Sequence, residues 1–163
     1  MANIPIIIIL FVAFCVSTFF NFANAVGMTF IVVGHVYCDT CGVEFETTLS
    51  QSIGEAIVKL ECRNSIDQSY TYQSKDIVVD KRGNYEIEVM GDYEESDCNV
   101  ILVRSPSQDC NDPIEKWRKA RVVLTTTDGV RGNVRFANTL GFKKRTSHLG
   151  CNKFLKKWGY FEL

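Results

Sequence analysis

The sequence predicts an all-β fold, a small antiparallel β-barrel or sandwich that is stabilised by disulfides and carries a short C-terminal helix. Apolar and polar residues alternate with the two-residue period of strands along most of the chain after residue 26. Six or seven such short segments follow one another, as they do in barrels and sandwiches. The same region holds an even set of cysteines, which is typical of a small secreted disulfide framework. They are Cys38, Cys41, Cys62, Cys98, Cys110 and Cys151.

The first 25 residues have the pattern of a secretory signal peptide. Residues 6–14 are nearly all apolar, and Ala23-Asn24-Ala25 matches the small-residue site of signal peptidase, so we expect cleavage after this tripeptide. The alternative is an uncleaved anchor, but the apolar stretch is short and Asn21 interrupts its end. Cleavage also removes Cys15 and leaves the even set of six. We therefore expect a single domain at 26–163, secreted to the extracellular space or cell wall without stable membrane insertion.

The first half of this domain contains three clear strand patterns. Residues 30–37 are apolar on both faces, as in a strand that is covered on both sides. Residues 56–62 place Ala56, Val58, Leu60 and Cys62 on one face and charged residues on the other. Residues 85–89 alternate in the same way, and Arg82-Gly83-Asn84 provides the turn before them.

The second half predicts a hairpin and a helix. Residues 98–103 and 122–124 are again apolar on both faces. Asp128-Gly129 tolerates the positive φ values of a two-residue turn, so we expect residues 121–127 and 130–136 to pair as a hairpin. In the second arm, Val130, Val134 and Phe136 alternate with Arg131, Asn133 and Arg135. Residues 151–158 have a helical pattern, with Phe154, Leu155 and Trp158 on one side.

Several short motifs resemble a known family. Gly34-His35-Val36-Tyr37-Cys38-Asp39-Thr40-Cys41 is similar to the G-x-V-Y-C-D-x-C signature of the plant Ole e I pollen-allergen and extensin-like family. The resemblance covers essentially the whole mature region. Gly42 stands where the family usually has Arg, and the chain has no N-x-Ser/Thr acceptor, so glycosylation at Asn is not carried over. Further segments in the family's order are Leu60-Glu61-Cys62, Cys98-Asn99-Val100, Asp109-Cys110-Asn111-Asp112, Leu140-Gly141-Phe142 and Cys151.

Spacing alone does not choose among the pairings that six cysteines allow. The resemblance implies Cys38 with Cys110, Cys41 with Cys151, and Cys62 with Cys98, in a small β-barrel-like fold of a secreted plant protein. Without the resemblance, the Cys38-x-x-Cys41 spacing is also compatible with a redox dithiol or a zinc site. A redox motif needs these two sulfurs to bridge each other, and a zinc site needs a second close pair, which the sequence lacks.

The sequence does not predict an enzyme, a cofactor or a metal. His35 lies in the first strand pattern and His148 in a loop. The sequence identifies no nucleophile that either imidazole could activate as a general base. Common hydrolase and phosphate-binding motifs are absent from the sequence. Glu86 and Glu88 could serve as a carboxylate pair, but their alternation on a strand favours a solvated surface. The formal net charge of −1 gives no argument for nucleic acid as a partner.

The hypothesis that remains for the function is a non-catalytic extracellular module that contacts a cell-wall polysaccharide or a cell-surface receptor. The resemblance links it to pollen and growing tissue. The alternatives are a signalling ligand for a membrane receptor kinase and an apoplastic hydrolase. Trp117, Trp158, Tyr160 and Phe161 are candidates for stacking on sugar rings. The candidate polyanion-binding residues are Lys143, Lys144, Arg145, Lys153, Lys156 and Lys157.

Overall fold

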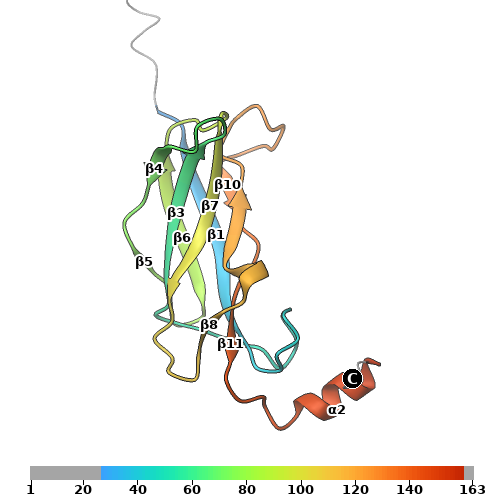
Figure 1. Ribbon diagram of the computed structural model, residues 1–163. Helices are drawn as coiled ribbons and strands as arrows, with labels where there is room; N and C mark the ends of the chain where they lie inside the picture. Colours follow the sequence, from blue (N-terminus) through green and yellow to red (C-terminus); the bar gives the residue numbers. More distant parts are fainter. Residues whose placement is uncertain (1–26, 160–163) are drawn as a thin grey trace, which may run out of the picture.

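The computed structural model describes residues 27–159, which form two facing β-sheets (Figure 1). The predicted signal peptide lies outside the described residues. The first sheet contains six strands: β1 (Thr29–Asp39), β2 (Gln51–Ser52), β6 (Asn84–Met90), β8 (Cys110–Pro113), β10 (Val134–Phe136) and β11 (Leu140–Lys144). The second contains five: β3 (Ile57–Asn64), β4 (Tyr70–Gln73), β5 (Ile77–Val78), β7 (Ser96–Arg104) and β9 (Lys119–Val122).

The long strand β1 organises the first sheet. Its first half pairs with β6 on one side and β10 on the other, and its second half pairs with β2 and β11. β10 and β11 both run parallel to β1. The sheet is therefore mixed, and the expectation of a wholly antiparallel fold is wrong for this half of the molecule.

The second sheet is antiparallel and closes the core from the other side. Its strand order is β4-β3-β7-β9, with β5 also pairing with β3. The sheets do not join into a barrel, so the sandwich is the correct one of the two predicted architectures. Alternation predicted the inward faces of β3 and β6 correctly. The core they build includes Phe30, Val32, Val58, Leu60, Cys62, Tyr85, Ile87, Val89 and Val100.

The predicted hairpin around Asp128-Gly129 does not form. β9 pairs with β7 in the second sheet, whereas β10 pairs with β1 in the first, so the segment between them crosses from one sheet to the other. A turn does occur there, and Gly129 has the positive φ of 78° that the sequence suggested. Turn chemistry is local, but each arm finds its hydrogen-bond partner in a different sheet.

The inward and outward faces of β10 are also reversed. Arg135 is only 6% exposed, whereas Phe136 is 82% exposed. Val103 and Val123 are exposed as well, so residues 98–103 and 122–124 are covered on one face and not on both. In β1, the residues of the first half that face away from the core are half-buried, and the last four residues are fully buried.

Two short helical segments complete the described chain. The 3₁₀ helix η1 (Glu115–Trp117) precedes β9, and α2 (Cys151–Lys157) matches the predicted C-terminal helix. Phe154 and Leu155 are half-buried in α2, whereas its lysines are exposed. Figure 1 shows α2 beside the sandwich, at the end opposite the start of β1. No helix within residues 27–159 is long and apolar enough to cross a membrane.

Candidate functional site

Three disulfides connect the parts of the sandwich. Cys38–Cys110 joins β1 to β8, Cys62–Cys98 joins β3 to β7, and Cys41–Cys151 attaches α2 to the segment after β1. These are the pairs that the family resemblance implies. Cys38 and Cys41 have different partners, so they do not bridge each other as a redox dithiol would.

The segment of residues 40–50, here the 40–50 loop, is held by buried polar contacts. The fully buried carboxylate of Asp39 accepts hydrogen bonds from the backbone N–H groups of Cys41 and Gly42, both at 2.9 Å, and of Glu44 at 2.7 Å. The Thr40 hydroxyl donates to the Leu49 carbonyl at 2.8 Å. Because several donors converge on one carboxylate, this loop is fixed to the end of β1. The loop is the platform of α2 in the sense that the Cys41–Cys151 disulfide and a hydrogen bond from His148 N–H to the Thr40 carbonyl attach the helix to it.

Tyr37 lies just before this platform. It is almost fully buried, and burial raises the pKa of its hydroxyl to about 12, with smaller contributions from the negative charges of Asp39, Glu46 and Glu44. The phenol therefore stays neutral in the folded protein well above ordinary pH.

A groove separates the 40–50 loop from α2. It has a volume of about 580 Å³ and is lined by Phe45, Glu46, Thr47, Thr48, Phe154 and Trp158. The Phe154 and Trp158 rings lie 6.2 Å apart, centroid to centroid, with a tilt of 46°. Trp158 is 66% exposed, so its ring is available as a wall of the groove. Sequence patterns gave no signal for the opposite wall, because residues 45–48 have no strand or helix period.

The structure splits the predicted polyanion-binding residues into two groups. Lys143 Nζ lies 3.3 Å from Glu44 Oε1, and Lys144 Nζ lies 3.2 Å from Asp109 Oδ2. Arg145 donates a hydrogen bond to Asn111 Oδ1 at 3.5 Å. These three cations therefore serve local contacts at and beyond β11.

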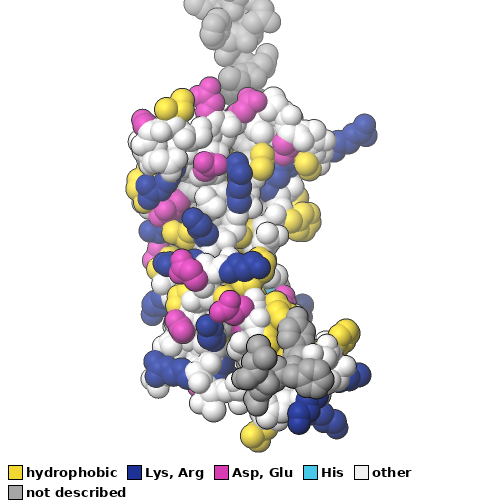
Figure 2. Space-filling view, turned by 45° about the vertical axis from the view of Figure 1, so that its right-hand side comes forward, with side chains coloured by type: hydrophobic (Ala, Val, Ile, Leu, Met, Phe, Trp, Pro, Cys, Tyr) yellow, Lys and Arg dark blue, Asp and Glu magenta, His cyan; other side chains and the backbone are white. Residues whose placement is uncertain are grey.

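The second group is on α2. Lys153, Lys156 and Lys157, here the helix lysines, are exposed and have no ion-pair partner within residues 27–159. Spacings of three and four residues place them next to one another on the helix surface. Figure 2 shows some Lys and Arg side chains at the end of the molecule that carries α2, with others spread over the rest of this face. Of the predicted cations, these three are free to bind an external anion.

The other aromatic candidates behave differently. Trp117 donates its indole N–H to the Glu44 carbonyl, and Lys116 Nζ lies 5.1 Å from the centre of the Trp117 ring. Trp117 therefore fastens η1 to the 40–50 loop. Tyr160 and Phe161 lie outside the described residues.

The histidines have structural partners. His35 Nδ1 lies 3.0 Å from Asn84 Oδ1, and its Nε2 lies 3.3 Å from Ser52 Oγ. His148 Nδ1 accepts a hydrogen bond from the Gly150 backbone N–H at 3.1 Å, just before α2. Between residues 27 and 159, no group of three or more His, Cys, Asp or Glu side chains is placed to hold a metal ion. The described residues near α2 thus combine two aromatic rings, a groove and three unpaired lysines.

Comparisons with known proteins extend over the same region. A family model described as "Pollen protein Ole e 1 like" matches residues 28–159. "Anther-specific protein LAT52" of Solanum lycopersicum is 42% identical over 156 residues, or 96% of each chain. "Pollen allergen Che a 1" of Chenopodium album is 36% identical over 100% of this chain and 98% of its own. The crystal structure of the major plantain pollen allergen Pla l 1 superposes with a TM-score of 0.67 and 27% identity, covering 76% of this chain and 99% of that one.

Proposed function

Since this chain belongs to the Ole e 1 like family of pollen proteins, we propose that it is a secreted, non-catalytic pollen protein that binds acidic cell-wall polysaccharide through α2 and the adjacent groove. Residues 1–25 direct export, and the disulfides form on that route. The observation that carries the proposal is the group of three unpaired helix lysines, together with the exposed ring of Trp158 at the end of the same helix.

The chemistry of the surface fits a polyuronate. Such a polymer has one carboxylate on each sugar ring, so a single chain can reach several helix lysines at once. Sugar rings present apolar C–H faces that pack on an aromatic ring such as Trp158. The groove volume of about 580 Å³ falls in the usual range for ligand sites. Glu46 lines the groove, so a bound uronate turns its hydroxyl groups and not its carboxylate toward this side chain.

The anchoring of α2 also supports this role. A helix of seven residues is not stable by itself in water. Here Cys41–Cys151 fixes the first residue of the helix, and the His148 backbone N–H donates to the Thr40 carbonyl at 2.8 Å. The lysines are therefore held near one another before binding, which lowers the entropy cost of association.

The test is retention of the secreted protein on immobilised polygalacturonate at low salt. Replacing the helix lysines by glutamate (K153E/K156E/K157E) should abolish retention. The matched control K75E/K81E/R82E changes net charge by the same amount at exposed cations far from α2 in the sequence, and it should still be retained. High salt should release the wild type, because exposed charges are screened.

Two results would contradict the proposal. Wild-type protein that passes through the column at low salt does not bind this polymer. Equal loss in both triple variants means that only net charge matters. Trp158→Ala should reduce retention without altering its salt dependence, which separates ring stacking from charge attraction.

A further inference from the structure

A second candidate surface lies on the outer face of the first sheet, across β6, β1 and β10. The strand register places Glu88, Ile31 and Val134 in one row and Glu86, Val33 and Phe136 in the next. We call these six residues the acidic–apolar face. Each row begins with a carboxylate on β6 and ends with an apolar side chain on β10.

This face is open to solvent. Phe136 is 82% and Val134 is 39% exposed, and Glu86 and Glu88 are exposed without an ion-pair partner among residues 27–159. A groove of about 580 Å³ runs over one end of it, with Val33, His35, Val78, Asn84, Glu86 and Phe136 among its lining residues. No Lys or Arg contributes to that lining. Large exposed apolar groups that gather on one face of a soluble protein commonly mark an interaction site.

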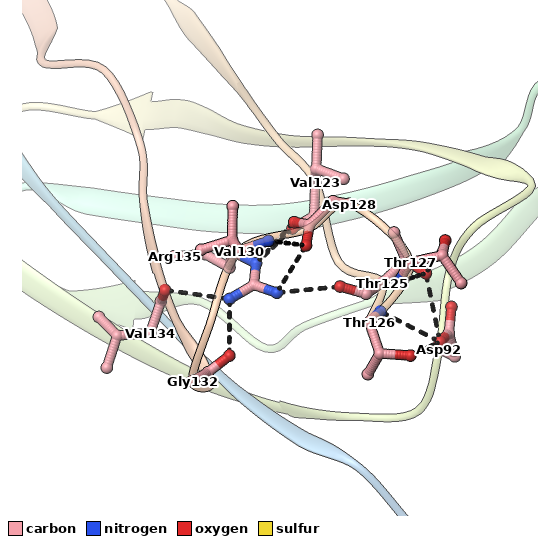
Figure 3. Close-up of polar contacts among 10 residues, drawn as sticks. All are labelled: Asp92, Val123, Thr125, Thr126, Thr127, Asp128, Val130, Gly132, Val134 and Arg135. Atoms are coloured by element: carbon pink, nitrogen blue, oxygen red, sulfur yellow. Dashed lines mark hydrogen bonds and ion pairs between the residues drawn. The ribbon is translucent and has the colours of Figure 1, made fainter.

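The outward position of Phe136 has a structural cause beneath it. Arg135 takes the inward position of β10, with its guanidinium 4.8 Å from the centre of the Phe30 ring. Figure 3 shows the same group donating hydrogen bonds to the carbonyls of Thr125 at 2.9 Å and Gly132 at 3.0 Å. This network fixes β10 from below. Its exposed side chains are therefore presented on a rigid strand and not on a mobile loop.

We propose that the acidic–apolar face binds a basic, extended segment of a partner protein in which Lys or Arg occupies alternate positions. Side chains on one face of an extended chain repeat about every 7 Å, the same repeat that separates Glu86 from Glu88. The aliphatic stems of such side chains can pack on Ile31 and Val33 while their charged ends reach the glutamates. Phe136 offers a ring face for a further cation.

This surface is distinct from the one proposed for polysaccharide. Its carboxylates repel a polyuronate, whereas the helix lysines repel a basic segment. The two proposals can therefore be tested independently of each other. Loss of polygalacturonate retention leaves this inference untouched, and the reverse is also true.

The probe is an acetylated and amidated peptide in which lysine alternates with valine and threonine, added to ¹⁵N-labelled protein. Backbone amide shifts should move in β1, β6 and β10 and not in α2, and they should weaken with added salt. A peptide of the same composition with glutamate in place of lysine should cause no shift. Glu86→Lys combined with Glu88→Lys should weaken binding roughly tenfold, since two attractive contacts become repulsive.

The matched control reverses two other exposed carboxylates, Glu94→Lys with Glu95→Lys, which should leave the peptide affinity unchanged. Phe136→Ser should weaken binding while the amide spectrum of the rest of the sandwich is preserved. The proposal is overturned if the lysine peptide causes no shift in this face, or if both charge-reversal pairs act alike. It is also overturned if a neutral oligosaccharide such as cellohexaose shifts the same amides and binding is unchanged by reversal of Glu86 and Glu88.

Discussion

The ring of Tyr37 lies directly against Gly141. A Cβ atom at position 141 would come within 2.8 Å of Tyr37 Cζ and 2.9 Å of Ile114 Cδ1. Tyr37 on β1 and Gly141 on β11 are also paired residues of the parallel ladder. The two motifs Val-Tyr-Cys-Asp and Leu-Gly-Phe therefore meet in space, and the glycine leaves room for the phenol.

Gly141→Ala should destabilise the fold by about 1–3 kcal/mol, because the added methyl group overpacks a buried contact. Urea unfolding would measure the change. In the double variant with Tyr37→Val, the space vacated by the ring accepts the methyl group, so the two costs should not add. Strict additivity of the two changes would show that the ring and the glycine do not interact.

Removing the Cys41–Cys151 bridge should act locally as well as on overall stability. The bridge spans 110 residues of sequence, for which loop entropy suggests about 3–5 kcal/mol. In Cys41→Ala/Cys151→Ala, hydrogen exchange should accelerate first in the 40–50 loop and α2, while β3 and β7 stay protected. In the comparison variant Cys62→Ala/Cys98→Ala, the faster exchange should appear in the second sheet. Equal acceleration throughout both variants would contradict a specific role of the first bridge in mounting α2.

Local pattern was sufficient for part of the fold. β3 and β6 alternate strictly and bury the expected side chains, because each has one neighbouring sheet to face. The helical spacing of residues 151–158 is likewise realised in α2. In β3 and β6, period, burial and secondary structure all agree, whereas in α2 the helix forms but Trp158 of its apolar side is 66% exposed.

The sequence failed where distant partners decide the outcome. Asp128-Gly129 supports a turn wherever it stands, but strand pairing depends on β7 and β1, which lie far away in the sequence. An arginine in an alternating segment suggests an outward side chain, yet Arg135 is buried because carbonyls of the crossing segment accept hydrogen bonds from its guanidinium. Partners that are distant in the sequence also explain why the predicted polyanion-binding residues fall into a paired group and an unpaired group. Glu44 and Asp109 neutralise Lys143 and Lys144 from segments that no local pattern connects to them.

Replacing Arg135 tests the role of this buried network. Arg135 Nε lies 3.2 Å from Asp128 Oδ2, and the Arg135→Met variant leaves that carboxylate and several carbonyls without their donor. We expect a loss of about 3–5 kcal/mol in urea unfolding, as for other broken buried ion pairs. Arg131→Met, an exposed arginine in the same segment, should stay within about 0.5 kcal/mol of wild type. If Arg135→Met and Arg131→Met had similar effects, the stabilisation would come from the positive charge of the segment and not from the buried contacts of Arg135.

The neutral tyrosines predict a loss of stability in alkaline solution. Burial, together with nearby carboxylates, raises the pKa of Tyr37 from 10.0 to about 12. Burial also raises the pKa of Tyr85, which contacts Gly34. Below pH 10 both phenols are protonated in the folded and unfolded chains, so they contribute no pH dependence. Above it the unfolded chain loses these protons first, which favours unfolding.

Each such phenol should lower the free energy of unfolding by up to about 1.4 kcal/mol per pH unit between its unfolded and folded pKa values. For Tyr37 this window runs from pH 10 to about 12. Urea unfolding across that range should therefore give a falling stability curve, and Tyr37→Phe should make it shallower, since phenylalanine has no proton to lose. All other ionisable groups are common to both variants, so the difference between the two curves isolates the phenol. Parallel curves for wild type and Tyr37→Phe, or an ultraviolet titration in which Tyr37 ionises near pH 10 in the folded protein, would show that this hydroxyl is not shielded as the burial of its ring requires.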